Sequence, residues 1–133
     1  MSKILIIDDD LNICKVLVKI FTRMDHDIQW SLTLKQGLDK VFAEQFDVVF
    51  LDVNLPDGNG LEAIELIHEH LHAPEIIIMT GDSNPDGAEL AMKSRAWDYI
   101  QKTGVHQEFE LSLTRALEYR QQKQFKSNHT TIK

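Results

Sequence analysis

Three short apolar runs, each followed by a polar or acidic residue, most constrain how this chain folds. They are residues 4–7 before Asp8, residues 46–51 before Asp52, and residues 75–79 before Thr80. Runs of this kind are typical of strands buried on both faces, as in a parallel sheet. Weaker strand patterns occupy residues 27–31 and 97–100. The sequence therefore predicts five strands.

Between these strands the apolar residues repeat with the period of an α-helix. Helices are predicted over residues 12–24, 34–44, 61–71, 85–94 and 107–125. Alternating strands and helices imply right-handed crossovers and a parallel sheet covered on both faces. We expect an α/β fold, a doubly wound five-stranded parallel sheet with five helices.

The residues that follow the predicted strands share the chemistry of an ion-binding site. They are Asp8, Asp9 and Asp10 after the first strand, Asp52 after the third, Thr80 after the fourth and Lys102 after the fifth. The carboxyl ends of parallel strands form one crevice, so these side chains should converge. Clustered carboxylates repel one another unless a cation neutralises them. Mg²⁺ suits a few carboxylates completed by water or phosphate oxygens.

Phosphoryl transfer is the reaction that this set of residues favours. A lysine beside the cluster can bind a phosphate oxygen, and a threonine hydroxyl can donate to another. One carboxylate can itself be the nucleophile and form an aspartyl phosphate. Each residue also has an ordinary structural explanation. Asp10 is expected to cap the next helix while Asp8 and Asp9 face the crevice, and Thr80 or Lys102 alone would be unremarkable. Their joint placement favours the functional interpretation.

Charge and length limit the kinds of partner. The 133 residues suit one domain, and 14 basic against 21 acidic residues give a net charge of −7. That balance argues against non-specific binding to nucleic acid or to an anionic membrane. The single cysteine cannot form an intrachain disulfide, and no run approaches the roughly 20 apolar residues of a spanning helix. We expect a cytoplasmic domain over residues 1–119. Residues 120–133, which lack acids, would extend the last helix or begin a linker in a longer protein.

Four motifs in this order resemble the receiver domain of two-component response regulators. They are the acidic pair Asp8-Asp9, the loop from Asp52 to Gly60 with its D-x-x-L-P-x-x-N-G pattern, Thr80-Gly81, and the segment from Ala96 to Lys102. The resemblance covers about residues 3–119. It implies a CheY-like, flavodoxin-like (βα)₅ fold with strand order 2-1-3-4-5.

The resemblance also implies how the site works. Asp52 would be the phosphoacceptor, receiving its phosphoryl group from a histidine kinase or a phosphotransfer protein. Asp8, Asp9, Asp52 and the backbone carbonyl of Asn54 would bind Mg²⁺. Thr80 and Lys102 would contact the phosphoryl group once it is in place.

Further residues would control the signal and its duration. Tyr99 would swing inward when Thr80 moves towards the phosphate, which would alter the surface over residues 85–119. That face would also serve a homodimer. Asn54 and Asp82 occupy the positions that tune the phosphoryl lifetime in the family. The output would be that of a transcriptional response regulator, and a stand-alone receiver or phosphorelay module is the alternative.

Three features of the sequence bear on the backbone. The family usually has proline after the lysine, where this chain has Thr103, which leaves the isomer of that bond open. The family often has glycine where this chain has Arg95. Gly58 and Gly60 are expected to supply positive φ in a tight loop.

Two other classes of function compete with a receiver that has only weak self-catalysed phosphoryl transfer. An aspartyl-phosphate hydrolase would carry a second acid as general acid, but Asn54 occupies that position. A flavodoxin-like binding module or degenerate receiver would lack the acidic pair, Asp52 or Lys102, and all are present.

Overall fold

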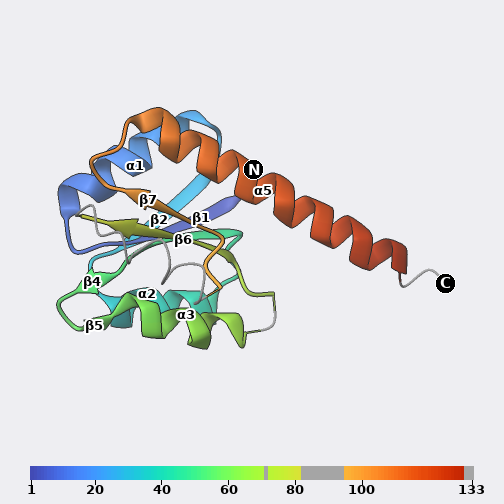
Figure 1. The fold of residues 1–133 in the computed structure, drawn as a ribbon, viewed down its shortest axis with the longest axis horizontal. Coiled ribbons are helices and arrows are strands. Elements are labelled where there is room, and N and C mark those ends of the chain that lie inside the picture. The colour runs from blue at the N-terminus through green and yellow to red at the C-terminus, as the bar shows by residue number, and fades with distance from the viewer. Residues whose placement is uncertain (71, 82–94, 131–133) are drawn as a thin grey trace.

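The structure is a computed structural model that describes residues 1–70, 72–81 and 95–130, with side chains as far as residue 125 in the last helix (Figure 1). The helix predicted over residues 85–94, and Asp82 before it, lie outside the described residues.

The centre of the molecule is a five-stranded sheet in which all neighbours are parallel. Its strands are β1 (Lys3–Ile7), β2 (Asp27–Ser31), β3 (Val48–Asp52), β6 (Glu75–Thr80) and β7 (Asp98–Gln101). Their order is β2-β1-β3-β6-β7. Counted along the chain within this sheet alone, that is 2-1-3-4-5, so the predicted topology is confirmed.

A second, two-stranded sheet was not predicted and accounts for the gap in the strand labels. It is an antiparallel hairpin of β4 (Asn54–Leu55) and β5 (Gly58–Asn59), directly after β3. Two-residue strands carry no hydrophobic periodicity, so the sequence pattern cannot reveal them. The hairpin matters because it extends the edge of the sheet where Asp52 lies.

Four helices are described: α1 (Leu11–Arg23), α2 (Leu34–Ala43), α3 (Gly60–His68) and α5 (His106–Thr130). Figure 1 shows α1 and α5 on one face of the sheet and α2 and α3 on the other. The doubly wound arrangement is therefore confirmed. Among the described helices, none has a stretch that is both long and apolar enough to cross a lipid bilayer.

The core has two halves because successive residues of each strand point to opposite faces. Ile4 and Ile6 pack with α1 and α5, whereas Leu5 and Ile7 pack with α2 and α3. All four side chains are fully buried. This burial on both faces explains why the strand sequences are continuously apolar, and it confirms the interpretation of the short runs.

Several element ends differ from the prediction. Strand β7 begins at Asp98, so Trp97 belongs to the preceding turn, and α3 ends at His68 rather than near residue 71. The expected cap is confirmed, since Asp10 accepts a hydrogen bond from the Asn12 backbone N–H at 2.9 Å. Helix α5 continues to Thr130, well past the polar change at residue 120.

The backbone also resolves three expectations. The described residues contain no cis peptide bond, so the bond before Thr103 is trans. Arg95 adopts a left-handed conformation with φ of 68°, which explains why glycine suits this position in the family. The expectation of positive φ at Gly58 and Gly60 is wrong, because none of the described glycines has positive φ. Close packing is the reason for glycine there: a Cβ at Gly60 would lie 2.5 Å from the carbonyl oxygen of Asp52.

Candidate functional site

Three acidic side chains meet at the carboxyl edge of the sheet. Asp52 ends β3, and Asp8 follows β1, the neighbouring strand. One carboxylate oxygen from each of Asp8, Asp9 and Asp52 lies within 4.8 Å of the others. For these three carboxylates, the convergence predicted from the strand ends is present in the structure.

Burial makes this acidic cluster electrostatically costly. Asp8 has no exposed surface and Asp52 is 3% exposed, whereas Asp9 is exposed. Burial raises the pKa of Asp8 to about 6, and the charge of Asp52 adds to that effect while Lys102 opposes it. A carboxylate in this position gains from a nearby cation.

Lys102 supplies one positive charge to the cluster. Its Nζ lies 2.8 Å from Oδ2 of Asp8 and 3.0 Å from Oδ2 of Asp52. Its backbone N–H donates to the carbonyl of Thr80 at 2.8 Å, which fixes the chain at the end of β7. Burial alone would lower the pKa of Lys102, but the two carboxylates raise it. The lysine is therefore charged and held between both acids.

The other carboxylate oxygens are positioned by backbone amides. Asp8 Oδ1 accepts from the Asp10 N–H at 2.9 Å, and Asp52 Oδ1 accepts from the Asn54 N–H at 3.1 Å. Asp8 Oδ2 is buried and has an ionic contact with Lys102, but its geometry gives it no hydrogen bond. This oxygen keeps a lone pair for a further cation.

The donor set fits a hard divalent ion. Carboxylate oxygens are the ligands that Mg²⁺ prefers, with water in the remaining positions. A cavity of about 500 Å³ opens beside Asp9, and its other walls come from the β4–β5 hairpin, including Asn54 and Pro56. Asp8, Asp9 and Asp52 would hold the ion, and the cavity gives space for its water.

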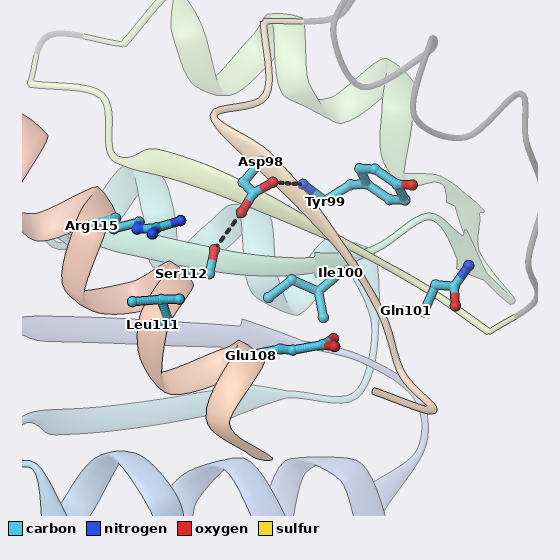
Figure 2. A pocket seen from close by; sticks show the side chains of 8 residues that line it. All are labelled: Asp98, Tyr99, Ile100, Gln101, Glu108, Leu111, Ser112 and Arg115. Carbon is cyan, nitrogen blue, oxygen red and sulfur yellow. Dashed lines mark hydrogen bonds between the residues drawn. The ribbon is translucent and has the colours of Figure 1, made fainter. Parts of the chain in front are cut away.

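Thr80 and Tyr99 lie on the strands next to Asp52. Thr80 ends β6, is 6% exposed, and follows Met79, which pairs with Asp52 in the sheet. Tyr99 lies on β7, is half-buried, and packs with the core half that contains α2 and α3. Figure 2 shows its ring pointing away from α5.

A second cavity, of about 440 Å³, lies between β7 and α5 (Figure 2). Asp98 accepts a hydrogen bond there from Ser112 Oγ at 2.7 Å, and Arg115 and Leu111 complete the wall formed by α5. Leu111 is 49% exposed. This groove is separate from the acidic cluster and faces outward along α5.

Sequence reasoning missed two sets of backbone contacts near the site. The backbone amide of Asp10 holds Asp8 in place, and no side-chain pattern signals a backbone contact. Asp57 bonds to the start of α2 and so fixes the hairpin that carries Asn54. An Asp-Gly pair in a loop signals a turn, but not which distant amides the aspartate will bind.

Comparisons with known proteins point to one family. A family model described as the response regulator receiver domain matches residues 4–114. Transcriptional regulatory protein ZraR of Klebsiella oxytoca is 31% identical over 114 residues, which cover 86% of this chain and 26% of ZraR. Response regulator ArlR of Staphylococcus aureus is 32% identical over 102 residues, or 77% of this chain and 46% of ArlR. The chain therefore spans less than half of these relatives.

A solved structure gives the same result in three dimensions. The response regulator DrrB, described as a Thermotoga maritima OmpR/PhoB homolog, superposes with a TM-score of 0.81 at 30% identity. The match covers 90% of this chain and 54% of DrrB. Because the family model spans most of the chain and the fold agrees, this protein belongs to the response regulator receiver domain family, a family of signalling proteins.

Proposed function

We propose that this chain is a phosphorylation-dependent switch in which Asp52 accepts a phosphoryl group from a histidine kinase or phosphotransfer protein. The observation that supports it most is the meeting of Asp8, Asp9 and Asp52 within 4.8 Å, with Lys102 bound to two of them. Bound Mg²⁺ would neutralise the charge that gathers when a phosphate donor approaches these acids.

The residues of the site have distinct tasks in the transfer. Asp52 Oδ1 is held by the Asn54 amide, which orients the carboxylate for in-line attack. A bond forms between an Asp52 oxygen and phosphorus while the phosphorus–nitrogen bond of a phosphohistidine breaks, and the leaving imidazole takes up a proton. Lys102, now 3.0 Å from Asp52, then pairs with the phosphoryl oxygens.

The same charge would drive the switch. A phosphoryl group adds about −1.5 to −2 of charge at neutral pH, which attracts a hydroxyl donor such as Thr80. Movement of Thr80 would let Tyr99 turn inward and change the surface that the sequence leads us to expect over residues 85–119. Asn54 and Asp82 would set how readily water reaches the phosphoryl group, and hence its lifetime.

The output is proposed to be transcriptional, since ZraR, which this chain matches over 26% of its length, is named a transcriptional regulatory protein. The proposed location of the protein is the cytoplasm. The groove between β7 and α5 lies within the face where a homodimer would form. The chain would be a switch rather than an enzyme that turns over substrate. A stand-alone receiver or phosphorelay module is the alternative output.

Intact-mass measurement after incubation with acetyl phosphate tests the proposal. Wild-type protein should gain one phosphoryl mass with Mg²⁺ and none with excess EDTA, whereas Asp52→Ala should gain none. Asp39→Asn, which changes an exposed aspartate on α2, is the control and should behave as wild type. An equal adduct on Asp52→Ala, or no adduct on wild type, would overturn the assignment.

A further inference from the structure

One side chain, Asp57, fastens the β4–β5 hairpin to the start of α2. Its Oδ1 accepts from the Leu34 N–H at 2.9 Å, and its Oδ2 accepts from the Lys35 N–H at 3.0 Å. These amides open α2 and have no partner within the helix. The hydrogen bonds from the Lys35 and Leu34 amides hold the pKa of Asp57 below its usual value. Both oxygens of an exposed aspartate are therefore committed to a distant segment.

Packing reinforces this connection from beneath. Leu34 and Leu55 are each 8% exposed and belong to the same half of the core. A Cβ at Gly58, next to Asp57, would lie only 2.9 Å from Leu34 Cδ2. The hairpin therefore rests directly on Leu34, and Asp57 closes the contact from the outer side.

The opposite end of the hairpin is joined to the acidic cluster. The Asn54 N–H donates to Asp52 Oδ1 at 3.1 Å, and the Gly60 N–H donates to the Val53 carbonyl at 3.2 Å. Asn54 pairs with Asn59 across the hairpin. A short path thus runs from Asp52 to Asn54 by a hydrogen bond, along the hairpin backbone to Asp57, and from Asp57 to α2 by two further hydrogen bonds.

We propose that Asp57 is a positioning residue for the metal site, because it sets where the hairpin places Asn54 relative to Asp8, Asp9 and Asp52. This inference rests on the proposed function, in which the Asn54 carbonyl is a Mg²⁺ ligand. Freed from α2, the hairpin pivots about Asp52 and Asn54 samples positions too far from the cluster. Binding of Mg²⁺ then has to order the hairpin as well, so the affinity for Mg²⁺ falls.

Asp57 could instead act only as a cap of α2. A matched variant distinguishes that role from the positioning role. Thr33 caps the same end of α2, since its Oγ1 accepts from the Gln36 N–H at 3.1 Å. Thr33→Ala therefore weakens the helix end and leaves the Asp57 contacts in place. Asp57→Ala removes both of those contacts, and Asp57→Asn keeps one acceptor oxygen.

Two measurements on the full chain test the inference. Mg²⁺ titration followed by backbone amide NMR should give a dissociation constant about tenfold higher for Asp57→Ala, an intermediate value for Asp57→Asn, and the wild-type value for Thr33→Ala. Hydrogen exchange of the Asn54 and Leu55 amides, measured without metal, should be faster only in the Asp57 variants.

Each contrary result has a clear meaning. Unchanged amide exchange or unchanged Mg²⁺ affinity in Asp57→Ala overturns the positioning role, as does an equal loss of affinity in Thr33→Ala. These outcomes leave the proposed function intact if wild type still forms its Mg²⁺-dependent phosphoryl adduct. Failure of that adduct in wild type defeats the proposed function by itself, whatever the exchange of the hairpin amides.

Discussion

A few individual residues set the charge and the orientation of the acidic cluster. Asp8 has no exposed surface, and this burial raises its pKa. A positive neighbour therefore stabilises the charged form of Asp8. Lys102 supplies that positive charge from the turn after β7, and the Asp10 and Asn54 amides fix the orientation of the acids. The cluster is therefore assembled by contacts from several loops rather than by one motif.

Arg95 is a residue whose backbone conformation costs stability. Its φ of 68° is left-handed, a conformation that a side chain disfavours and glycine accepts. Arg95→Gly should raise the free energy of unfolding by about 0.5–1 kcal/mol, since the contact of His68 with the Arg95 carbonyl remains. Urea denaturation measures the change. Asp25→Gly, at φ of 65°, should raise the free energy of unfolding by less, because aspartate tolerates this conformation better than arginine does. An Arg95→Gly variant no more stable than wild type would show that the Arg95 conformation is not strained.

His26 should make stability depend on pH near neutrality. Burial lowers its pKa, helped by the N-terminal amine and opposed by Asp25 and Asp47, and its Nδ1 accepts from the Ser2 N–H at 3.3 Å. Because the folded state disfavours the charged ring, stability is lost as pH falls below the unfolded pKa of about 6.5. Between pH 7.5 and 5.5, His26→Gln should lose less stability than wild type in urea denaturation. Parallel pH profiles for the two proteins would contradict this.

At the scale of elements, a buried ion pair between Arg120 and Glu75 and two more exposed pairs anchor α5 to the amino edge of the sheet. Arg120 is 8% exposed and lies 3.2 Å from Asp47 Oδ1 and 3.1 Å from Glu75 Oε2. It also donates to the Ala73 carbonyl at 2.8 Å. Lys123 contacts the other oxygen of Glu75 from a more exposed position. The helix is thus tied to the segments that begin β3 and β6.

Replacing Arg120 should therefore lower the free energy of unfolding far more than replacing Lys123 does. Arg120→Met leaves the buried Glu75 with the more exposed Lys123 and also removes the donor to Asp47 and to the Ala73 carbonyl, so the free energy of unfolding should fall by about 3 kcal/mol. Lys123→Met breaks a pair whose lysine is 48% exposed, so its cost should stay below about 1 kcal/mol. Chemical denaturation of both variants at one pH compares the two values. Equal losses would show that Arg120 does not carry the anchor.

The elements that the sequence predicts best are those with a strong hydrophobic period. The β1 run and α1 follow directly from their apolar residues, and Asp10 gives the start of α1. The β4–β5 hairpin was missed because each of its strands has two residues. The sequence pattern puts Trp97 in the last strand, yet its backbone lies before β7.

The site divides along the same physical line. The convergence of Asp8 and Asp52 follows from topology, because both residues lie at the carboxyl edge of neighbouring parallel strands. The role of Asp57 does not, since its partners come from α2 and depend on how the loop packs. The sequence pattern puts Arg120 in a polar tail. Its burial could not be predicted, because burial of a charge depends on partners that are distant in sequence.

At the scale of the whole molecule, the two edges of the sheet have different tasks. The acidic cluster lies at the carboxyl edge, whereas Arg120 binds at the amino edge, beside the first residue of β6. Figure 1 shows the last turns of α5 projecting beyond the sheet. The composition placed the domain boundary at residue 119, but we propose that the folded unit includes Arg120 and Lys123.

Truncation of the chain tests that boundary. A chain that ends at Tyr119 loses the Arg120 anchor and should unfold at a lower urea concentration, with a loss similar to that of Arg120→Met, about 3 kcal/mol. A chain that ends at Phe125 keeps the anchor and should match the full chain. Equal denaturation midpoints for the two truncated chains would place the boundary at residue 119.

The central claim is that Asp52 is the phosphoacceptor of a metal-dependent switch, and borohydride trapping tests it most directly. Borohydride reduces an aspartyl phosphate to homoserine, which peptide mass mapping locates. After treatment with acetyl phosphate and Mg²⁺, the account predicts homoserine at position 52 and none when EDTA replaces the metal. Homoserine at Asp8 or Asp9 instead, or reduction at position 52 without metal, would contradict the account.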